Sequence, residues 1–265
     1  MKKFYVIGNP VDHSLSPKLH NYWFKKNNIK AVYNIKKINE LDIKKVVSEM
    51  KDGKIDGINV TVPFKKSIIP FLDELTPIAN EARSVNTIYN KDNIIIGDNT
   101  DVSGFEHGLN HIDYNVTGKK IFILGAGGVA PSIILALKKM SASKIILSNR
   151  TKEKAEDMKK IYPYIELADW GDIKPFDMII NATSVGLKVE DELKLNFGQS
   201  GSNKLFYDVI YNPKKTKFLL QGKKLGSQTE NGKKMFAYQA QLAFETWHGI
   251  KPSVDERVLQ LLEND

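Results

Sequence analysis

The apolar residues of this 265-residue chain fall into short runs separated by amphipathic stretches. In the second half, runs near 121–124, 144–147, 177–182 and 205–210 have the length of buried strands, and 129–140, 151–160 and 214–221 have the spacing of helices. Gly222 is expected just past the end of the last of these helices. Because parallel strands need crossover connections, the alternation over 119–227 predicts a doubly wound parallel sheet.

The first part of the chain predicts another α/β layer. Strands are expected at 4–7, 31–38 and 55–62, followed by a pair at 87–89 and 94–96. Helices are expected from Pro17, with Ser16 as the N-cap, at 40–51, from 64 onward and from about Ser103. The 40–51 helix is expected to turn these residues inward: Leu41, Val46, Val47 and Met50.

The C-terminal part predicts a helix at 235–247 with one buried stripe, and a last helix that ends near 262. Together these patterns predict two α/β domains with an active-site cleft between them. One domain is expected to contain residues 1–101 and 237–265, and the other residues 102–236.

Composition narrows the class of protein. Apolar residues make up 42% of the chain, which is enough for a sizeable core. The absence of cysteine excludes a disulfide scaffold, thiolate catalysis and cysteine-ligated metal clusters. The chain has no apolar run of about 20 residues and no signal-peptide pattern at its start, so we expect a cytoplasmic protein.

A net charge of +8 raises the question of nucleic-acid binding. The lysines, however, are scattered along helix faces, and no concentrated basic tract is present. We interpret them as solvated surface that could also steer anionic ligands.

The stretch IFILGAGGVA at 121–130 contains the first candidate site. Gly125, Gly127 and Ala130 fit the G-x-G-x-x-G/A pattern at the end of the first strand of a dinucleotide-binding unit. The first glycine permits a tight turn, the second lets the backbone approach a pyrophosphate, and the small third residue permits close packing of the helix. The helix N-terminus then faces the phosphates. The bland alternative is a tight strand-to-helix turn without a ligand.

Arg150 ends the next expected strand, where NAD-binding proteins carry an acidic residue for the ribose hydroxyl. A guanidinium pairs with phosphate, whereas a carboxylate would repel it. We therefore favour NADP as the cofactor over the alternative that Arg150 is only a solvated charge.

Polar residues also follow the expected strands of the first domain. Ser14 and Ser16 lie beside a helix N-terminus and suit a carboxylate, while the nearby His13 is interpreted as an ordinary loop residue. Asn59 and Thr61 share one side of their strand. Lys65 lies just past the carboxyl end of that strand, where α/β proteins place their chemistry, although paired lysines are usually solvated.

Carbonyl reduction develops negative charge on an oxygen that must be stabilised and protonated. A lysine ammonium can do both, and a nearby carboxylate can orient it. Lys65 and Asp101 are the plausible pair, while the bland alternative makes Asp98 or Asp101 a turn or cap residue. The side chains of Asn59, Thr61 and Asn86 suit a ligand rich in hydroxyl groups.

Nine segments occur in an order and spacing that resemble the NADP-dependent shikimate dehydrogenases. They are GNPVDHSLSPKLHN from Gly8, NVTVPFK from Asn59, SVNT from Ser84, GDNTD from Gly97, GAGGVA from Gly125, NRT from Asn149, NATSVGL from Asn181, DVIYNP from Asp208 and NGKKMFAYQAQLAFETW from Asn231. The resemblance covers nearly the whole chain. It implies a substrate domain, a Rossmann-type NADP domain and the reversible reduction of 3-dehydroshikimate to shikimate in chorismate and aromatic amino-acid biosynthesis.

The resemblance also implies roles for individual residues. Lys65 and Asp101 would form the catalytic pair, and Ser14 and Ser16 would bind the substrate carboxylate. Further substrate contacts would come from Asn59, Thr61, Asn86, Tyr211 and Gln239. The implied cofactor site comprises Gly125, Ala126, Gly127, Gly128, Val129, Asn149, Arg150, Thr151, Lys154, Asn181, Thr183, Val209 and Gly232. No metal is implied, the only partner is a small-molecule substrate, and the chain is expected to be a monomer or a homodimer.

Four positions depart from the family pattern. Val102 replaces a usual glycine, so we expect strain if that position needs a positive φ. Lys154 stands where a second arginine is common, and its ammonium would bind a 2′-phosphate less firmly than a bidentate guanidinium. Lys233 and Lys234 replace a more apolar helix start.

Three alternatives remain open on the sequence. An NAD-preferring quinate/shikimate dehydrogenase would share the motifs, although Arg150 argues against it. A non-catalytic sensor could keep the fold but would not need Lys65 and Asp101. Nucleic-acid binding is supported only by the net charge.

Overall fold

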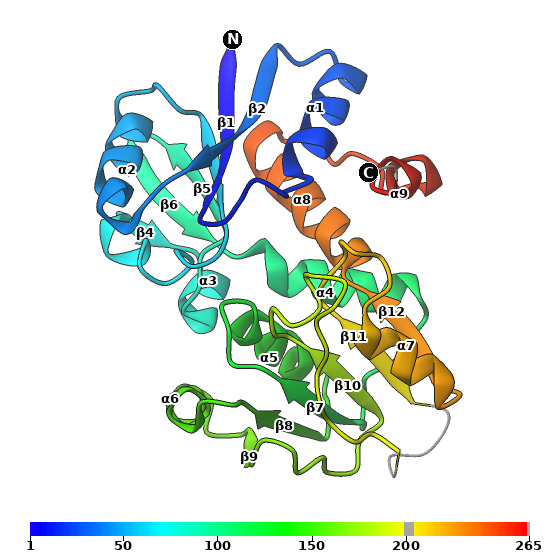
Figure 1. Cartoon of the computed structure of the whole chain (residues 1–265). Helices are drawn as coiled ribbons and strands as arrows, with labels where there is room; N and C mark the ends of the chain where they lie inside the picture. The colour runs from blue at the N-terminus through cyan, green and yellow to red at the C-terminus, as the bar shows by residue number, and fades with distance from the viewer. Residues whose placement is uncertain (199–203, 264–265) are drawn as a thin grey trace. The chain divides into compact units, whose positions relative to one another are not determined.

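The computed structural model describes residues 1–198 and 204–263 of the chain, which cluster into two compact units. Unit 1 comprises Met1–Gly104 and Ala237–Asp265, and unit 2 comprises Phe105–Phe236. Each unit contains its own six-stranded sheet with helices around it (Figure 1). The predicted class, two α/β sheets of which one is Rossmann-like, is confirmed. None of the described helices combines the length and hydropathy that a membrane span requires.

Unit 1 has a mixed sheet of strand order β2-β1-β3-β5-β6-β4. The β1–β2, β1–β3 and β4–β6 pairs are parallel, whereas β3–β5 and β5–β6 are antiparallel. Its elements are β1 (Lys2–Gly8), α1 (Ser16–Lys26), β2 (Ala31–Lys37), η1 (Glu40–Asp42), α2 (Ile43–Lys51), β3 (Gly57–Val60), η2 (Ile69–Phe71), β4 (Glu74–Leu75), α3 (Pro77–Ala82), β5 (Thr87–Lys91), β6 (Ile94–Asp98), the start of α4 (Thr100–His111), most of α8 (Lys233–His248), and α9 (Glu256–Leu261).

Side-chain alternation along the strands gives this sheet two apolar faces. One face packs against α2, whose buried residues recur at helical spacing: Ile43, Val46, Val47 and Met50. The other face carries aromatic rings that contact α1 and α8, as Phe4 does with Phe24 and Trp247. Both faces of the central strands are therefore buried. Polar residues that could form a site are placed at the strand ends and in the loops.

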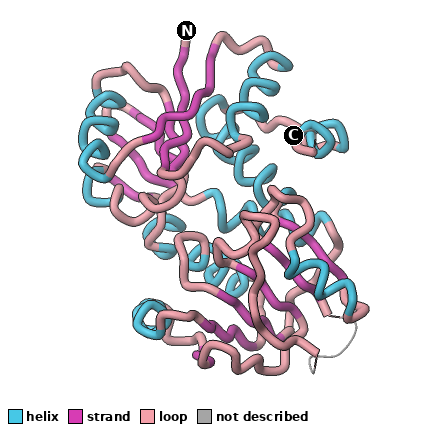
Figure 2. Tube along the Cα trace, in the orientation of Figure 1, coloured by secondary structure: helices cyan, strands magenta, loops and turns pink. Residues whose placement is uncertain are grey.

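Unit 2 has a fully parallel sheet of strand order β12-β11-β10-β7-β8-β9. Its strands are labelled in Figure 1 and drawn in magenta, in the same orientation, in Figure 2. The doubly wound parallel sheet predicted for this part is confirmed. Its elements, besides the ends of α4 and α8, are β7 (Lys120–Leu124), α5 (Ala130–Lys139), β8 (Lys144–Ser148), α6 (Lys152–Ile161), β9 (Glu166–Ala168), β10 (Met178–Asn181), β11 (Leu205–Asp208), α7 (Lys217–Lys224) and β12 (Gln228–Asn231).

The turn between β7 and α5 depends on glycine. Gly125 has a φ of +104°, and a Cβ at this position would lie 2.7 Å from the Thr183 side chain and 3.0 Å from the Ala182 backbone. Both its conformation and its surroundings therefore exclude other residues. The sequence assignment of this position as the tight-turn glycine is consistent with this geometry.

Two expectations for the first domain are wrong. Leu41 is 95% exposed, because a capping box between Asn39 and Asp42 holds residues 40–42 as a 3₁₀ turn and α2 begins only at Ile43. The chain after Pro63 forms hydrogen-bonded turns and then η2 in place of an α-helix. Pro70 lacks the N–H that an α-helix through this segment would need.

The starts of two helices also differ from expectation. Ser16 is the first residue of α1 and not its N-cap, and its backbone N–H donates to the Ser14 hydroxyl at 3.3 Å. α4 begins at Thr100 and not near Ser103, so Val102 lies inside this helix, where it is fully buried. Val102 is not among the described residues that have a positive φ. The expected strain at Val102 is therefore not present, since helical φ values suit a residue with a Cβ.

The helix expected at 214–221 begins later. Thr216 caps α7 by accepting a hydrogen bond from the Leu219 N–H, so the helix starts at Lys217. Gly222 lies inside α7 and not past its end. A Cβ there would lie 2.5 Å from the Phe206 ring, so glycine permits the helix to pack closely on β11.

Candidate active site

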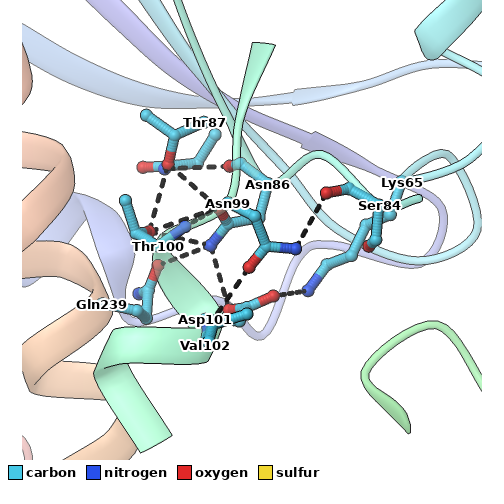
Figure 3. Close-up of polar contacts among 10 residues, drawn as sticks. Lys65, Ser84, Asn86, Thr87, Asn99, Thr100, Asp101, Val102 and Gln239 are labelled. Atoms are coloured by element: carbon cyan, nitrogen blue, oxygen red, sulfur yellow. Dashed lines mark hydrogen bonds and ion pairs between the residues drawn. The ribbon is translucent and has the colours of Figure 1, made fainter. Parts of the chain in front are cut away.

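A buried ion pair lies just past the carboxyl ends of β3 and β6 in unit 1. The Lys65 ammonium is 2.5 Å from Asp101 Oδ2, and the two side chains are only 11% and 8% exposed (Figure 3). Lys65 comes from the turn that follows β3, and its carbonyl accepts a hydrogen bond from the Val85 N–H. Asp101 comes from the first turn of α4, where a carboxylate interacts favourably with the helix dipole.

The other oxygen of this carboxylate has a separate donor. Asn86 Nδ2 lies 2.9 Å from Asp101 Oδ1, and it also lies 3.3 Å from Gln239 Oε1 on α8. Each oxygen of Asp101 therefore has its own partner, and the lysine side chain is held by only one of them (Figure 3). A lysine held beside a carboxylate in this way can transfer a proton to an oxygen atom that is brought against it.

Around this pair, buried polar side chains bond mainly to one another. Asn86, Thr87 and Thr100 are connected by their side chains, and Asn99 donates to the Ser84 carbonyl at 2.8 Å. Thr100 also donates its backbone N–H to Asn86 Oδ1 at 2.7 Å. The side chains of such a network have little rotational freedom, so the network also fixes the position of Asp101, to which Asn86 bonds.

Asn59, on β3, is buried beside this network. Its Oδ1 accepts from the Tyr33 hydroxyl at 2.7 Å, and its Nδ2 lies 3.1 Å from both the Asn86 carbonyl and Thr87 Oγ1. Both ends of the Asn59 amide are therefore hydrogen-bonded within unit 1.

The loops after β1 and β3 lie side by side. The Thr61 N–H donates to the Ile7 carbonyl at 2.9 Å, and the Asn9 N–H donates to the Val62 carbonyl at 3.0 Å. In the loop after β1, Ser14 Oγ lies 3.2 Å from Ser16 Oγ. The two hydroxyls predicted to bind a carboxylate are therefore adjacent.

In unit 2, the glycine loop is tied to the end of the next strand. The Ala126 N–H donates to Asn149 Oδ1 at 2.9 Å, and Asn149 Nδ2 donates to the Thr151 carbonyl at 2.7 Å. Arg150 and Lys154, which flank this point, are both exposed. A dinucleotide whose phosphates bind at the glycine loop would have two positively charged side chains, Arg150 and Lys154, within five residues of Asn149, which bonds to that loop.

The loops after β10, β11 and β12 share a second polar cluster. Asn181 is fully buried; its Nδ2 lies 3.1 Å from Asp208 Oδ1, and its Oδ1 accepts from the Thr183 N–H and hydroxyl. Gly232 packs so closely on Val209 that a Cβ would lie 2.0 Å from the Val209 carbonyl oxygen. Four predicted cofactor residues thus lie at the carboxyl ends of β10, β11 and β12: Asn181, Thr183, Val209 and Gly232.

Burial raises the pKa of Asp208 to about 6, although Thr216, the Ile210 N–H and Asn181 all donate to the carboxylate. These donors favour the charged form and only partly offset its desolvation. Tyr211 lies nearby in the sequence, and its ring packs on Phe236 at 4.6 Å between centroids.

Known proteins match this chain over nearly its whole length. Residues 6–88 match the family model described as shikimate dehydrogenase substrate binding domain, and residues 108–214 match the one described as shikimate / quinate 5-dehydrogenase. A shikimate dehydrogenase (NADP(+)) of Pelagibacter ubique is 56% identical over 262 residues, which cover 99% of each chain. The chain belongs to the shikimate dehydrogenase family.

Solved structures of the shikimate dehydrogenase family agree with the fold. The shikimate dehydrogenase of Aquifex aeolicus is 37% identical, with a TM-score of 0.90 over 100% of this chain and 98% of its own. A shikimate 5-dehydrogenase of Listeria monocytogenes, solved with shikimate and NAD, is 31% identical, with a TM-score of 0.90 over 99% of this chain and 96% of its own.

Membership in this family confirms three sequence-based predictions. The chain is an oxidoreductase, it is NADP-dependent, and it acts in aromatic amino-acid biosynthesis. The glycine loop, with its obligatory positive φ at Gly125 and the exposed Arg150 nearby, is compatible with that cofactor.

Several residues of the two clusters have no role that the sequence predicts. They are Tyr33, Thr87, Thr100, Asp208 and Thr216. Three of them lie within motifs quoted above, which could have marked them: Thr87 in SVNT, Thr100 in GDNTD and Asp208 in DVIYNP. Tyr33 lies in an ordinary strand pattern, and nothing in the sequence marks its contact with Asn59.

Proposed function

We propose that this chain catalyses the reversible NADPH-dependent reduction of 3-dehydroshikimate to shikimate with Lys65 and Asp101 as its catalytic pair. The buried 2.5 Å contact between these two side chains is the observation that carries the proposal. Bound NADPH supplies the hydride. The protein must then stabilise and protonate the oxygen on which negative charge develops.

In the direction of reduction, Lys65 stabilises and protonates this oxygen. Its ammonium interacts with the developing alkoxide and donates a proton to that oxygen. Asp101 holds the ammonium in place through Oδ2, and its charge favours the return of a proton to the lysine. In the direction of oxidation, the same pair accepts the proton of the shikimate hydroxyl.

The remaining substrate contacts follow from the chemistry of shikimate. The adjacent hydroxyls of Ser14 and Ser16 bind its carboxylate, and polar side chains bind its ring hydroxyls. The residues that we assign to the ring are Asn59, Thr61, Asn86, Tyr211 and Gln239, with Asn59 acting through its protein partners. Residues 1–101 and 237–265 form the substrate domain in this proposal.

Residues 102–236 form the NADP domain. The glycine loop binds the pyrophosphate with its backbone N–H groups, and Arg150 and Lys154 bind the 2′-phosphate. The loops around Asn181, Thr183, Val209 and Gly232 line the nicotinamide side. We further propose a cytoplasmic enzyme without a nucleic-acid partner, as a monomer or a homodimer.

The test is absorbance of reduced nicotinamide with purified protein and four pairings: shikimate or quinate, each with NADP+ or NAD+. Reduction that is fast only with shikimate and NADP+ supports the proposal. Comparable rates with quinate or NAD+ would contradict its specificity. Binding of shikimate without turnover in any pairing would contradict catalysis and favour a sensor.

A further inference from the structure

The orientation of the Asn86 amide is fixed by the backbone. The Thr100 N–H is only a donor, and it lies 2.7 Å from Asn86 Oδ1. The opposite end of the amide, Nδ2, must therefore face Asp101 Oδ1, which it does at 2.9 Å (Figure 3). In the flipped orientation an amide oxygen would oppose the carboxylate, which can only accept while it is ionised.

Thr87 adds a second donor to the same oxygen. Its hydroxyl donates to Asn86 Oδ1 at 3.1 Å and accepts from Asn59 Nδ2 at 3.1 Å. Asn59 is oriented by the backbone as well, because its Nδ2 also donates to the Asn86 carbonyl, which can only accept. Asn59 Oδ1 consequently faces the Tyr33 hydroxyl.

Tyr33 begins this series of hydrogen bonds. Its hydroxyl donates to Asn59 Oδ1 at 2.7 Å, and its backbone N–H and carbonyl both bond to the Asn21 side chain. The ring is fully buried and stacks on His20, with centroids 4.4 Å apart and planes 5° apart. The phenol therefore has a fixed position, and every donor from Tyr33 through Asn59, Thr87 and Asn86 points toward Asp101.

We propose that Tyr33 and Thr87 are positioning residues for the oxidoreductase reaction: acting through Asn59 and Asn86, they hold Asp101 so that its free oxygen binds the Lys65 ammonium. This inference rests on the proposed function of Lys65 and Asp101. Loss of either hydroxyl removes one hydrogen bond from the series, so the Asn86 amide keeps its orientation but is held less firmly against Asp101. Lys65 then spends less time in the geometry needed for proton transfer.

A matched pair of substitutions separates the hydroxyl from the packing of Thr87. Thr87→Val keeps the shape and loses the hydrogen bonds of the hydroxyl to Asn86 and from Asn59, so we expect kcat to fall roughly tenfold or more. Thr87→Ser keeps the hydroxyl and should stay within about threefold of wild type. KM for shikimate should change less than kcat in both variants, because neither change removes a substrate contact.

Tyr33→Phe tests the far end of the series, with Tyr22→Phe on α1 as its control. The first should lower kcat roughly three- to tenfold, and the second should leave it unchanged, because Tyr22 lies outside the network. Equal losses in Thr87→Ser and Thr87→Val, or no loss in Tyr33→Phe, would overturn the proposal. Far-ultraviolet circular dichroism confirms that each variant is folded.

A second readout does not depend on turnover. The side-chain NH₂ signals of Asn86, assigned by their disappearance in Asn86→Asp, report its orientation in ¹H–¹⁵N spectra. They should shift and exchange faster with water in Tyr33→Phe and Thr87→Val, and they should not change in Tyr22→Phe. Unchanged signals would overturn the positioning role. A wild-type protein without turnover would contradict the proposed function, and the Asn86 signals would still decide the positioning role.

Discussion

The Lys65 ammonium and the Asp101 carboxylate form a direct ion pair in the interior of unit 1, with Nζ and Oδ2 2.5 Å apart. Removing one member of such a pair leaves a buried charge without compensation. Lys65→Met should therefore do two things. It should lower kcat by about a thousandfold or more, because the proton donor is lost, and it should lower the free energy of unfolding by roughly 3–5 kcal/mol.

The two effects can be separated. In the double variant Lys65→Met/Asp101→Asn the uncompensated carboxylate is gone, so stability should recover in urea unfolding while turnover stays absent. Lys66→Met is the control, since Lys66 is the exposed neighbour. Turnover by Lys65→Met at more than about one-tenth of the wild-type rate would refute the catalytic role.

Cofactor preference should depend on Arg150. Arg150→Ala removes the guanidinium that we assign to the 2′-phosphate, so KM for NADP+ should rise about tenfold or more while KM for NAD+ hardly changes. The control is Lys160→Ala, an exposed charge on α6 that pairs with Asp157. If Arg150→Ala leaves the ratio of kcat/KM for the two cofactors unchanged, the phosphate is bound elsewhere.

Val102 supports the helix that carries Asp101. Its side chain is fully buried in α4, so Val102→Gly creates a cavity and loses helix propensity. We expect a loss of about 2–4 kcal/mol in urea unfolding. Asn110→Gly, at an exposed position of the same helix, should cost only about 1 kcal/mol or less. A Val102→Gly protein as stable as wild type would revive the expectation of strain at this position.

The sequence predicts the four central strands of unit 2 well, because β7, β8, β10 and β11 are short apolar runs. The outer strands β9 and β12 are short and partly polar, so hydrophobic pattern marks them weakly. It predicts individual helix starts less well, since these depend on side-chain caps. Thr216 moves the start of α7, and the Asn39–Asp42 box turns Leu41 into solvent. Periodicity alone contains no information about which hydroxyl or carboxylate reaches a free backbone N–H.

The candidate site, too, is predicted from the sequence only in part. Lys65 and Asp101 could be named from their positions after a strand and before a helix, and the structure brings them together. The contact of Tyr33 with Asn59 joins β2 to β3 across the intervening β1, so it depends on the strand order. A residue whose partner is fixed by sheet order cannot be recognised before the order is known.

His20 should make the protein sensitive to acid. Burial, with a smaller contribution from His248, lowers its pKa from 6.5 to about 3, and both ring nitrogens are buried without a hydrogen-bond partner among the described residues. The unfolded chain therefore binds a proton more tightly than the folded protein. Stability is unaffected above about pH 6.5 and falls by roughly 3–5 kcal/mol as the pH drops toward 3.

His20→Phe fills the same aromatic site without a titrating group. The difference in unfolding free energy between variant and wild type should grow as the pH falls from 6.5 to 4. Part of the acid sensitivity should remain, because burial and the nearby Lys2 also lower the pKa of His248, to about 4, against the opposing effect of Asp56. Parallel stability curves for the two proteins over this range would show that His20 does not titrate in this way.

Asp208 should give the opposite dependence on pH. Its pKa is about 6 in the folded protein and near 3.8 in the unfolded chain, so the folded state binds the proton more tightly. Its contribution to stability is therefore fully present below about pH 3.8 and is lost as the pH rises through 6, a change of roughly 3 kcal/mol. Asp208→Asn cannot titrate, so the stability of wild type relative to this variant should decline between pH 4 and pH 7.

Thr216→Val provides the matched test. The Thr216 hydroxyl donates to Asp208 Oδ2 at 2.6 Å and favours the charged carboxylate, so its loss should raise the pKa of Asp208 further. The decline in stability should then extend to higher pH, on top of a constant loss from the missing helix cap. Urea unfolding at half-unit steps from pH 4 to pH 8 measures all three proteins. If the Thr216→Val curve declines over the same range as wild type, the hydroxyl does not control the charge of Asp208.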